Sequence, residues 1–174
     1  MNVYLDNAAT TPIWDMAKQA IINHLDDFGN PSSVHEFGRQ SRILIEDARE
    51  RIAKCINASP DEIYFTSGGS EANTLALNGR SYTASSKFEH HSVKTDWPKM
   101  FVHHDGFIKA YELGDLMSAW SETPFVVMSF MLVNNEIGTI MPIKELASIV
   151  HRYGVRLHTD AVQAVGSLKI DVKD

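Results

Sequence analysis

The sequence is poor in cysteine, and this scarcity limits the kinds of site that the chain can build. Cys55 is the one cysteine among 174 residues, so an internal disulfide and a cysteine-based zinc cluster are both excluded. Cys55 itself is expected to pack in the core, because it falls on the apolar face of a predicted helix. A nucleophilic cysteine would instead need exposure and a positively charged setting.

The chain also lacks an excess of positive charge and any long apolar run. Its net charge is -6, which argues against a nucleic acid or an anionic membrane surface as partner. No stretch approaches the roughly 18 consecutive apolar residues of a membrane span, and residues 1–5 lack the basic and apolar regions of a secretory signal. We therefore expect a cytoplasmic protein that binds neither nucleic acid nor membranes.

The pattern that is present predicts an α/β fold. Apolar residues recur at helical spacing within residues 13–25, 41–56, 111–120 and 142–152, and a further helix is expected after the glycines at 68–69. Strands are expected at residues 63–65, 81–88, 125–133 and 155–158, of which the third is a nearly continuous apolar run, as in a central parallel strand. We expect residues 1–12 to be an extended segment and residues 13–174 to form one domain around a parallel sheet.

An acidic side chain follows the last of these strands. Asp160 lies in the stretch His-Thr-Asp-Ala-Val-Gln at residues 158–163. Polar side chains at the carboxyl end of a parallel strand face the crevice where α/β proteins bind ligands. A buried carboxylate there needs a cationic partner, for which a protonated heteroaromatic nitrogen would serve. The alternative is that Asp160 caps the next helix through the N–H groups around Gln163.

A second candidate site is the stretch Thr-Ser-Gly-Gly-Ser-Glu-Ala-Asn at residues 66–73. Glycines and hydroxyls between a strand and a helix form an anion cradle, because the backbone can approach closely and the first N–H groups of the helix are unpaired. The stretch is neither a P-loop nor a dinucleotide fingerprint, so a phosphate site and a plain turn both stay open.

Two histidine pairs raise the possibility of a zinc site, which we do not favour. The pairs are His90–His91, after the strand at 81–88, and His103–His104, after the segment 100–102. Adjacent residues on a strand point to opposite faces, and no pair of ligands at helical spacing accompanies them, so we expect no metal. The imidazole of His90 could instead lie flat over an aromatic ligand.

Polar groups thus follow three predicted strands, at residues 66–68, at 134–135 and at Asp160, and their convergence indicates one ligand site. The motifs also form a longer series, at residues 4–12, 29–33 with His35 and 38–39, 66–73, 89–90, 134–139 and 158–163. This series resembles the pyridoxal-phosphate-dependent cysteine desulfurases, in the NifS/IscS-like branch of the class V aminotransferase superfamily. It follows the family's order over nearly the whole chain.

The resemblance implies a fold, a cofactor and a set of site residues. The fold is a three-layer, mainly parallel sheet flanked by helices, part of the large domain of fold type I pyridoxal-phosphate transferases. The cofactor phosphate would lie at Gly69 and Ser70, His90 would stack on the pyridine ring, and Asp160 would pair with the ring nitrogen. Asn135 and Gln163 would contact the hydroxyl side of the ring. The implied reaction takes sulfur from L-cysteine, giving alanine and a persulfide for iron–sulfur cluster biogenesis, in a homodimer.

Part of the family's pattern lies outside these 174 residues. The Schiff-base lysine belongs to a Ser-x-His-Lys segment beyond Asp160, and neither that segment, the mobile-loop cysteine nor the small C-terminal domain is present. Lys169 and Lys173 lie around a connection that has no catalytic lysine in the family.

Three interpretations therefore stay open. The chain is the N-terminal part of a desulfurase that needs a complementing C-terminal chain, or a truncated product of a complete one. It is a non-catalytic remnant that binds the cofactor without a covalent bond or pairs with a relative. Or it is a fragment of a selenocysteine lyase or of another class V aminotransferase.

Overall fold

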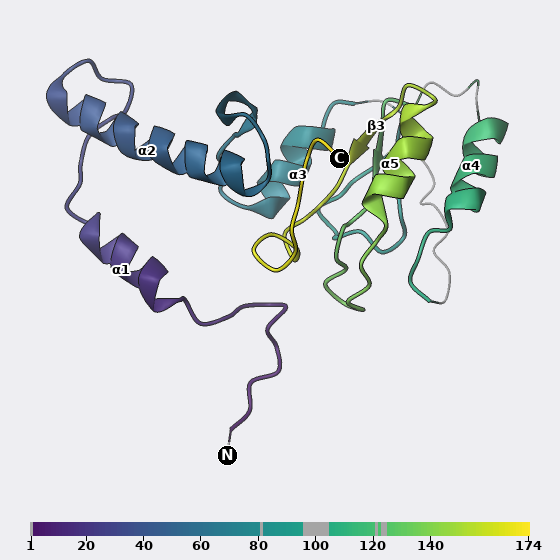
Figure 1. Cartoon of the computed structure of the whole chain (residues 1–174), viewed down its shortest axis with the longest axis horizontal. Coiled ribbons are helices and arrows are strands. Elements are labelled where there is room, and N and C mark those ends of the chain that lie inside the picture. Colours follow the sequence, from purple (N-terminus) through teal and green to yellow (C-terminus); the bar gives the residue numbers. More distant parts are fainter. Residues whose placement is uncertain (1, 81, 96–104, 121, 123–124) are drawn as a thin grey trace. The chain divides into compact units, whose positions relative to one another are not determined.

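The structure, a computed structural model, describes residues 2–80, 82–95, 105–120, 122 and 125–174 (Figure 1). The chain divides into two compact units. Unit 1 comprises Met1–Tyr64 and Lys169–Asp174, and unit 2 comprises Phe65–Leu168. Among the described residues, no helix combines the length and the apolarity that crossing a membrane requires.

Unit 2 is built on a parallel sheet of three strands, β1 (Thr83–Ser85), β2 (Val127–Ser129) and β3 (Arg156–His158). They lie in the order β1-β2-β3, with Ala84 opposite Met128 and Met128 opposite Leu157. This confirms the predicted parallel sheet. The regular strands are shorter than the ranges that the sequence predicts, although backbone hydrogen bonds continue past their ends, from the N–H of Phe130 to the carbonyl of His158 and from the N–H of Leu132 to the carbonyl of Asp160.

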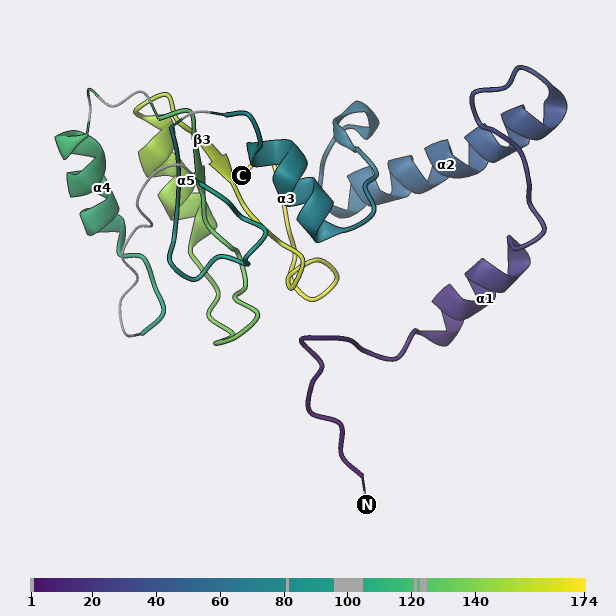
Figure 2. The same cartoon turned by 180° about the vertical axis from the view of Figure 1, so that it is seen from behind.

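Helices cover both faces of this sheet. Helices α4 (Ala110–Ala119) and α5 (Ile143–His151) share the main core with Met128, whereas the next strand residue, Val127, packs with Leu77 of α3 (Gly69–Leu77). Successive strand residues point to opposite faces, so α4 and α5 cover one face and α3 the other. The predicted three-layer arrangement is confirmed (Figures 1 and 2).

The two helices on the first face agree with their sequence signals. Helix α5 was expected at residues 142–152 and lies within that range, with Leu146, Ile149 and Val150 forming its buried stripe. Gly154 ends the segment in a left-handed conformation, with φ 71°, before β3 begins. Helix α4 matches its expected range to within one residue at each end.

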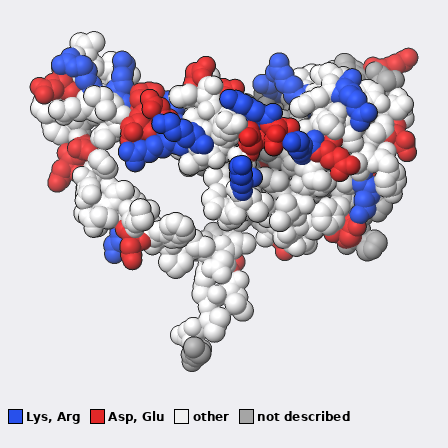
Figure 3. Space-filling model, in the orientation of Figure 1, with Lys and Arg blue, Asp and Glu red and all other residues white. Residues whose placement is uncertain are grey.

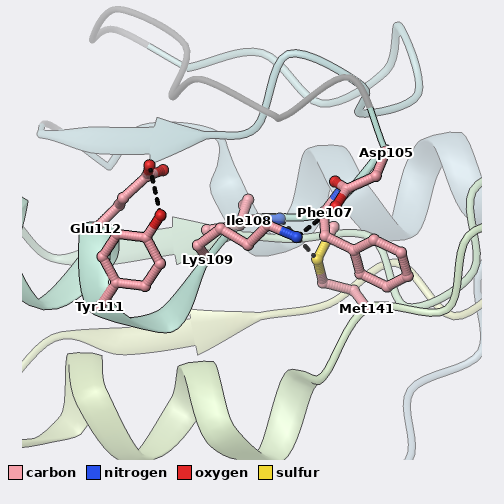
Figure 4. A network of polar contacts seen from close by, with 7 residues as sticks. All are labelled: Asp105, Phe107, Ile108, Lys109, Tyr111, Glu112 and Met141. Atoms are coloured by element: carbon pink, nitrogen blue, oxygen red, sulfur yellow. Dashed lines mark hydrogen bonds and ion pairs between the residues drawn. The ribbon is translucent and has the colours of Figure 1, made fainter.

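The entry to α4 is held by polar contacts that Figure 4 shows from close by. Lys109 forms an ion pair with Asp105, and the N–H of Ile108 points at the sulfur of Met141, 3.5 Å away. The hydroxyl of Tyr111 donates to a Glu112 carboxylate oxygen at 3.3 Å. These contacts place residues 105–110 against the loop that leads into α5.

Unit 1 contains α1 (Asp15–Asn23), α2 (Glu36–Cys55) and the short 3-10 helix η1 (Pro60–Glu62). Helix α2 begins at Glu36, so the predicted start at residue 41 is wrong. His35 caps the helix by accepting the N–H of Gly38 on Nδ1, at 3.3 Å. A Cβ on Gly38 would lie 2.5 Å from the carbonyl oxygen of Ser33, so this glycine permits close packing inside the helix, where it normally indicates a break.

Two further predictions in this region are wrong. Residues 63–65 are extended but form no strand, because no strand of the described residues pairs with them. Cys55 is exposed, not a core residue, and Leu44 and Ile52 on the same apolar face are exposed too. The opposite face carries alternating charges, including ion pairs from Arg51 to Asp47 and from Arg49 to Glu46 (Figure 3). The helix is amphipathic as predicted, but its apolar side is not covered.

Candidate active site

Asp160 lies directly after β3, where the sequence predicts a ligand-facing carboxylate. It is 5% exposed. Its Oδ2 accepts a hydrogen bond from Asn73 Nδ2 at 2.8 Å, and its Oδ1 accepts the backbone N–H of Val162 at 3.0 Å. Residues 162–164 form a turn and not a regular helix. The carboxylate of Asp160 therefore stabilises a turn, whereas the alternative hypothesis from the sequence was that it caps a helix.

Asn73 joins this carboxylate to the predicted stacking histidine. It lies on α3 and is 4% exposed. The same nitrogen, Nδ2, also lies 2.9 Å from Ser92 Oγ, and Ser92 Oγ lies 2.7 Å from His90 Nδ1. Four side chains from three segments therefore form one continuous chain of hydrogen bonds, with Asp160 and the half-buried His90 at its two ends.

A second carboxyl group is buried at the same end of the sheet. Glu89 accepts hydrogen bonds from Ser86 Oγ at 2.5 Å, from the N–H of Met131 at 2.9 Å and from Ser129 Oγ at 3.4 Å. Burial raises its pKa to about 7, the hydrogen bonds oppose the rise, and the charge of Asp160 adds to it. Near neutral pH this carboxyl group holds its proton for a large part of the time.

His158 shares the hydroxyl of Ser129 with Glu89. Its Nδ1 lies 2.8 Å from Ser129 Oγ. Burial lowers the pKa of His158, and the nearby charge of Asp160 works against that shift. Burial therefore favours the neutral form of this imidazole.

The N-terminus of α3 has the features of an anion cradle. Its first intrahelical hydrogen bond runs from the N–H of Ala72 to the carbonyl of Gly68, at 3.0 Å, so the N–H groups of residues 69–71 precede the helical ladder. Glu71 reaches back to Ser67, whose hydroxyl and N–H hold the pKa of Glu71 below its ordinary value. This contact fixes the loop before the helix.

The cradle adjoins the turn that contains Asp160. A Cβ built on Gly69 would lie 2.7 Å from Cγ2 of Val162, so a side chain at this position would displace the turn. The two halves of the predicted site, at residues 69–70 and 160–163, are thus in direct contact. Gln163 is half-buried in the same turn.

The two asparagines at residues 134–135 have different surroundings, because Asn134 is buried and holds a turn whereas Asn135 is partly accessible. Asn134 is buried; its Oδ1 accepts the N–H groups of Glu136 and Ile137, and its Nδ2 donates to the carbonyl of Phe88. Asn135 is half-buried at the start of the turn that Asn134 holds. Two residues before Asn134, Leu132 donates its N–H to the carbonyl of Asp160, at 2.9 Å.

Three residues of this site, Asn73, Ser92 and Ser129, are not assigned a role by the sequence analysis, although Asn73 ends the candidate stretch at residues 66–73. One signal was available for Asn73, which lies four residues after Gly69 and hence on the same helical face. His103 and His104, considered for zinc, lie outside the described residues. The part of the chain that the structure describes holds no group of three or more His, Cys, Asp or Glu residues arranged for a metal ion.

The donor set suits a phosphorylated heteroaromatic cation. The helix N-terminus offers N–H groups and the Ser70 hydroxyl to a phosphate. Asp160 is a buried carboxylate that accepts hydrogen bonds from neutral groups, Asn73 and the Val162 N–H, within the part of the chain that the structure describes, and a cationic ligand would balance its charge. His90 supplies a half-buried ring. Pyridoxal phosphate has the matching groups.

Comparison with known proteins agrees with this donor set. The family model for aminotransferase class-V matches residues 3–174. The chain is 44% identical to a cysteine desulfurase IscS of Dictyoglomus turgidum, over 99% of the chain and 48% of that protein. It is 39% identical to a putative cysteine desulfurase IscS 1 of Bacillus subtilis, over 99% of the chain and 49% of that protein.

Solved structures show the same relationship. The chain superimposes on SspA in complex with cysteine with a TM-score of 0.88 and 30% identity, covering 98% of this chain and 53% of that one. A NifS-like protein from Rickettsia africae gives a TM-score of 0.88 and 30% identity, over 98% of this chain and 51% of its own. The chain spans about half the length of the relatives that it matches.

Proposed function

Because the chain belongs to the class V aminotransferase family and is homologous to IscS- and NifS-type cysteine desulfurases, we propose that it is the N-terminal, cofactor-holding part of a pyridoxal-phosphate-dependent cysteine desulfurase. The observation that carries the proposal is the buried carboxylate of Asp160, which lies beside the N-terminus of α3 and whose hydrogen bonds, among the described residues, come from neutral groups. The family is pyridoxal-phosphate-dependent, and this arrangement supports the same cofactor here.

The residues of this chain would divide the work of holding the cofactor. Gly69 and Ser70 would bind the phosphate, Asp160 would pair with the ring nitrogen, and His90 would lie against the ring. Asn135 and Gln163 would contact the ring hydroxyl. Pyridoxal phosphate, when bound, supplies an electron-withdrawing ring that stabilises negative charge on an amino-acid substrate. Asp160 would strengthen that effect by keeping the ring nitrogen protonated.

Removing the charge of Asp160 tests this assignment. We expect the parent chain to bind pyridoxal phosphate weakly and without a covalent bond, and Asp160→Asn to weaken the binding at least about tenfold, which is about 1.4 kcal/mol. Absorbance titration measures both, with Asp115→Asn, an exposed change on α4, as control. Unchanged affinity in Asp160→Asn, in a variant that folds normally by circular dichroism, would remove the main support.

The absence of a covalent link is a separate expected result. Lys169 and Lys173 match no catalytic lysine of the resembled family, whose Schiff-base lysine belongs to a Ser-x-His-Lys segment that these 174 residues do not contain. Borohydride reduction in the presence of cofactor should therefore leave the intact mass of the chain unchanged. One stoichiometric phosphopyridoxyl adduct on either lysine would show that the chain provides its own Schiff base.

Desulfurase turnover would require residues from outside this sequence. We expect the 174 residues alone to release neither sulfide nor alanine from L-cysteine, because the lysine and cysteine segments are supplied elsewhere. Adding a polypeptide that carries both segments should restore sulfide release, and the same polypeptide with its lysine changed to alanine is the control. Continued inactivity in the presence of cofactor and complementing chain would favour the non-catalytic remnant.

Unit 1 supports association with a second chain. Trp14, just before α1, and Met16 on α1 are 80% and 83% exposed, and Leu44 and Ile52 on α2 are exposed as well. Apolar surface of this extent favours burial against a partner, either a second copy or the complementing C-terminal chain. We expect light scattering to report a dimer or larger species for the purified chain, and a stable monomer at all concentrations would contradict this.

A further inference from the structure

One amide nitrogen connects the two ends of the candidate site. Asn73 Nδ2 lies 2.8 Å from Asp160 Oδ2 and 2.9 Å from Ser92 Oγ. The amide orientation follows from chemistry, because a carboxylate only accepts hydrogen bonds and so must face the NH2 group. An NH2 group has two protons, and each one has a partner here.

The direction of the remaining hydrogen bonds then follows. Ser92 Oγ accepts one proton from Asn73 and keeps its own proton for His90 Nδ1, 2.7 Å away. The backbone N–H of Ser92 also points at the same ring nitrogen, at 3.3 Å. Two donors converge on His90 Nδ1, so this nitrogen acts as an acceptor, and the ring proton of the neutral imidazole lies on Nε2.

We propose that Asn73 is a positioning residue which, through Ser92, couples the carboxylate of Asp160 to the protonation pattern of His90. The hydrogen-bond chain holds Nδ1 of His90 as an acceptor and leaves Nε2–H as the group presented to a ligand. The proposal deepens the proposed function and rests on it in one respect. The hydrogen-bond chain would orient Asp160 and His90 together, and these are the two groups that would hold the cofactor ring.

A purely structural asparagine would not need this arrangement. Asn73 lies within α3, where asparagine is a poor helix former, and it is nearly fully buried. Its two protons bind side chains from two other segments, residues 92 and 160, and not the backbone of its own helix. A substitution at Asp160 should therefore alter the hydrogen bonding of His90 Nδ1 through Ser92.

Nuclear magnetic resonance of the cofactor-free chain, labelled with nitrogen-15 in histidine, reads this coupling directly. In the parent chain we expect His90 in one tautomer, with the proton on Nε2 and an unprotonated Nδ1. Asp160→Asn should shift the Nδ1 resonance of His90. In Ser92→Ala the hydrogen-bond chain is cut, so the same Asp160→Asn change should shift that resonance no longer.

A conservative variant separates the hydroxyl from simple packing. Ser92 and Asn73 line a hollow of about 430 Å³ together with Thr83 and Lys94, which leaves room for one additional methyl group. Ser92→Thr should therefore restore the response of His90 to Asp160→Asn. Asn78→Ala, an exposed change at the end of α3, should leave it unaltered. A shift at His90 that persists unchanged in Ser92→Ala would mean direct action through space and would overturn the proposal.

Cofactor affinity adds a second measurement. Asn73→Ala should weaken pyridoxal phosphate binding about tenfold, a size typical of losing an outer partner of a ligand-binding group. If the parent chain binds no cofactor while the resonance pattern holds, the proposed function fails and the coupling stands. If the cofactor binds but neither His90 nor the affinity responds to Asn73→Ala, the coupling fails alone. If Asn73→Ala does not fold, the same two measurements are made on Ser92→Ala.

Discussion

The variant Glu89→Gln is expected to gain about 3 kcal/mol of stability relative to the parent chain as the pH rises from 4.5 to 8. In the folded chain the pKa of Glu89 is raised from 4.5 to about 7, chiefly by burial. The folded state then holds a proton that the unfolded state has already released. The free energy of unfolding of the parent chain therefore falls across this interval, by about 1.4 kcal/mol for each pH unit.

Glutamine mimics the protonated carboxyl group and does not titrate, so the variant escapes this loss. It can still accept hydrogen bonds from Ser86 and Met131 through its oxygen and donate to Ser129 through its nitrogen. His158 has a lowered pKa and costs stability as the pH falls below its ordinary value of 6.5. Because parent and variant both contain His158, that contribution cancels in the difference.

Urea unfolding of both proteins at pH 5 and pH 8 measures the effect. The exposed change Glu136→Gln, in the turn after β2, is the control and should follow the parent chain at both pH values. A difference between parent and Glu89→Gln that is the same at both pH values would show that Glu89 ionises normally inside the fold.

The second large effect concerns the core that supports the site. Leu146 lies on α5 and is 0% exposed, in the same core as Met128 and Phe130. Leu146→Ala should lower the free energy of unfolding by about 2–5 kcal/mol, because it removes buried apolar contacts and leaves a cavity. Leu75→Ala makes the same chemical change on α3 at a position that is 64% exposed, and should cost less than about 0.5 kcal/mol. Chemical denaturation of the two variants side by side tests this, and similar losses would mean that Leu75 is covered in solution.

The elements that were predicted well are those whose signals are local. Helix α5 has a regular apolar stripe and is followed by Gly154, so both its range and the start of β3 follow from the sequence. Strand lengths are overestimated because a continuous apolar run also includes residues that are buried beyond the end of the regular strand. Phe130 is 0% exposed, yet it lies just beyond the end of β2.

Predictions failed where the decisive partner lies elsewhere in the chain. The start of α2 depends on close packing of Gly38 against the carbonyl of Ser33, which no helical periodicity reveals. The exposure of Cys55 depends on whether a partner covers the apolar side of α2, and the sequence of that helix gives no information on this point.

The candidate site shows the same division. Asp160 was predicted because it follows a strand directly, and the glycines at 68–69 because they precede a helix. Asn73 was not, because an asparagine inside a helix is normally a surface residue. Its importance depends on Ser92 and Asp160, which approach it only in the folded chain.

The order of the strands has a consequence for how the protein is made. β2 lies between β1 and β3, and β3 comes last in the sequence. In the interval after β2 has emerged from the ribosome and before β3 has emerged, β1 and β2 can already pair, and Glu89 can already bind the N–H of Met131. At roughly 5–20 residues per second, one edge of β2 then stays open for a time on the order of seconds. During that interval the nascent chain exposes an unpaired apolar strand that other chains can join, so β3 protects the newborn protein from aggregation as well as placing Asp160.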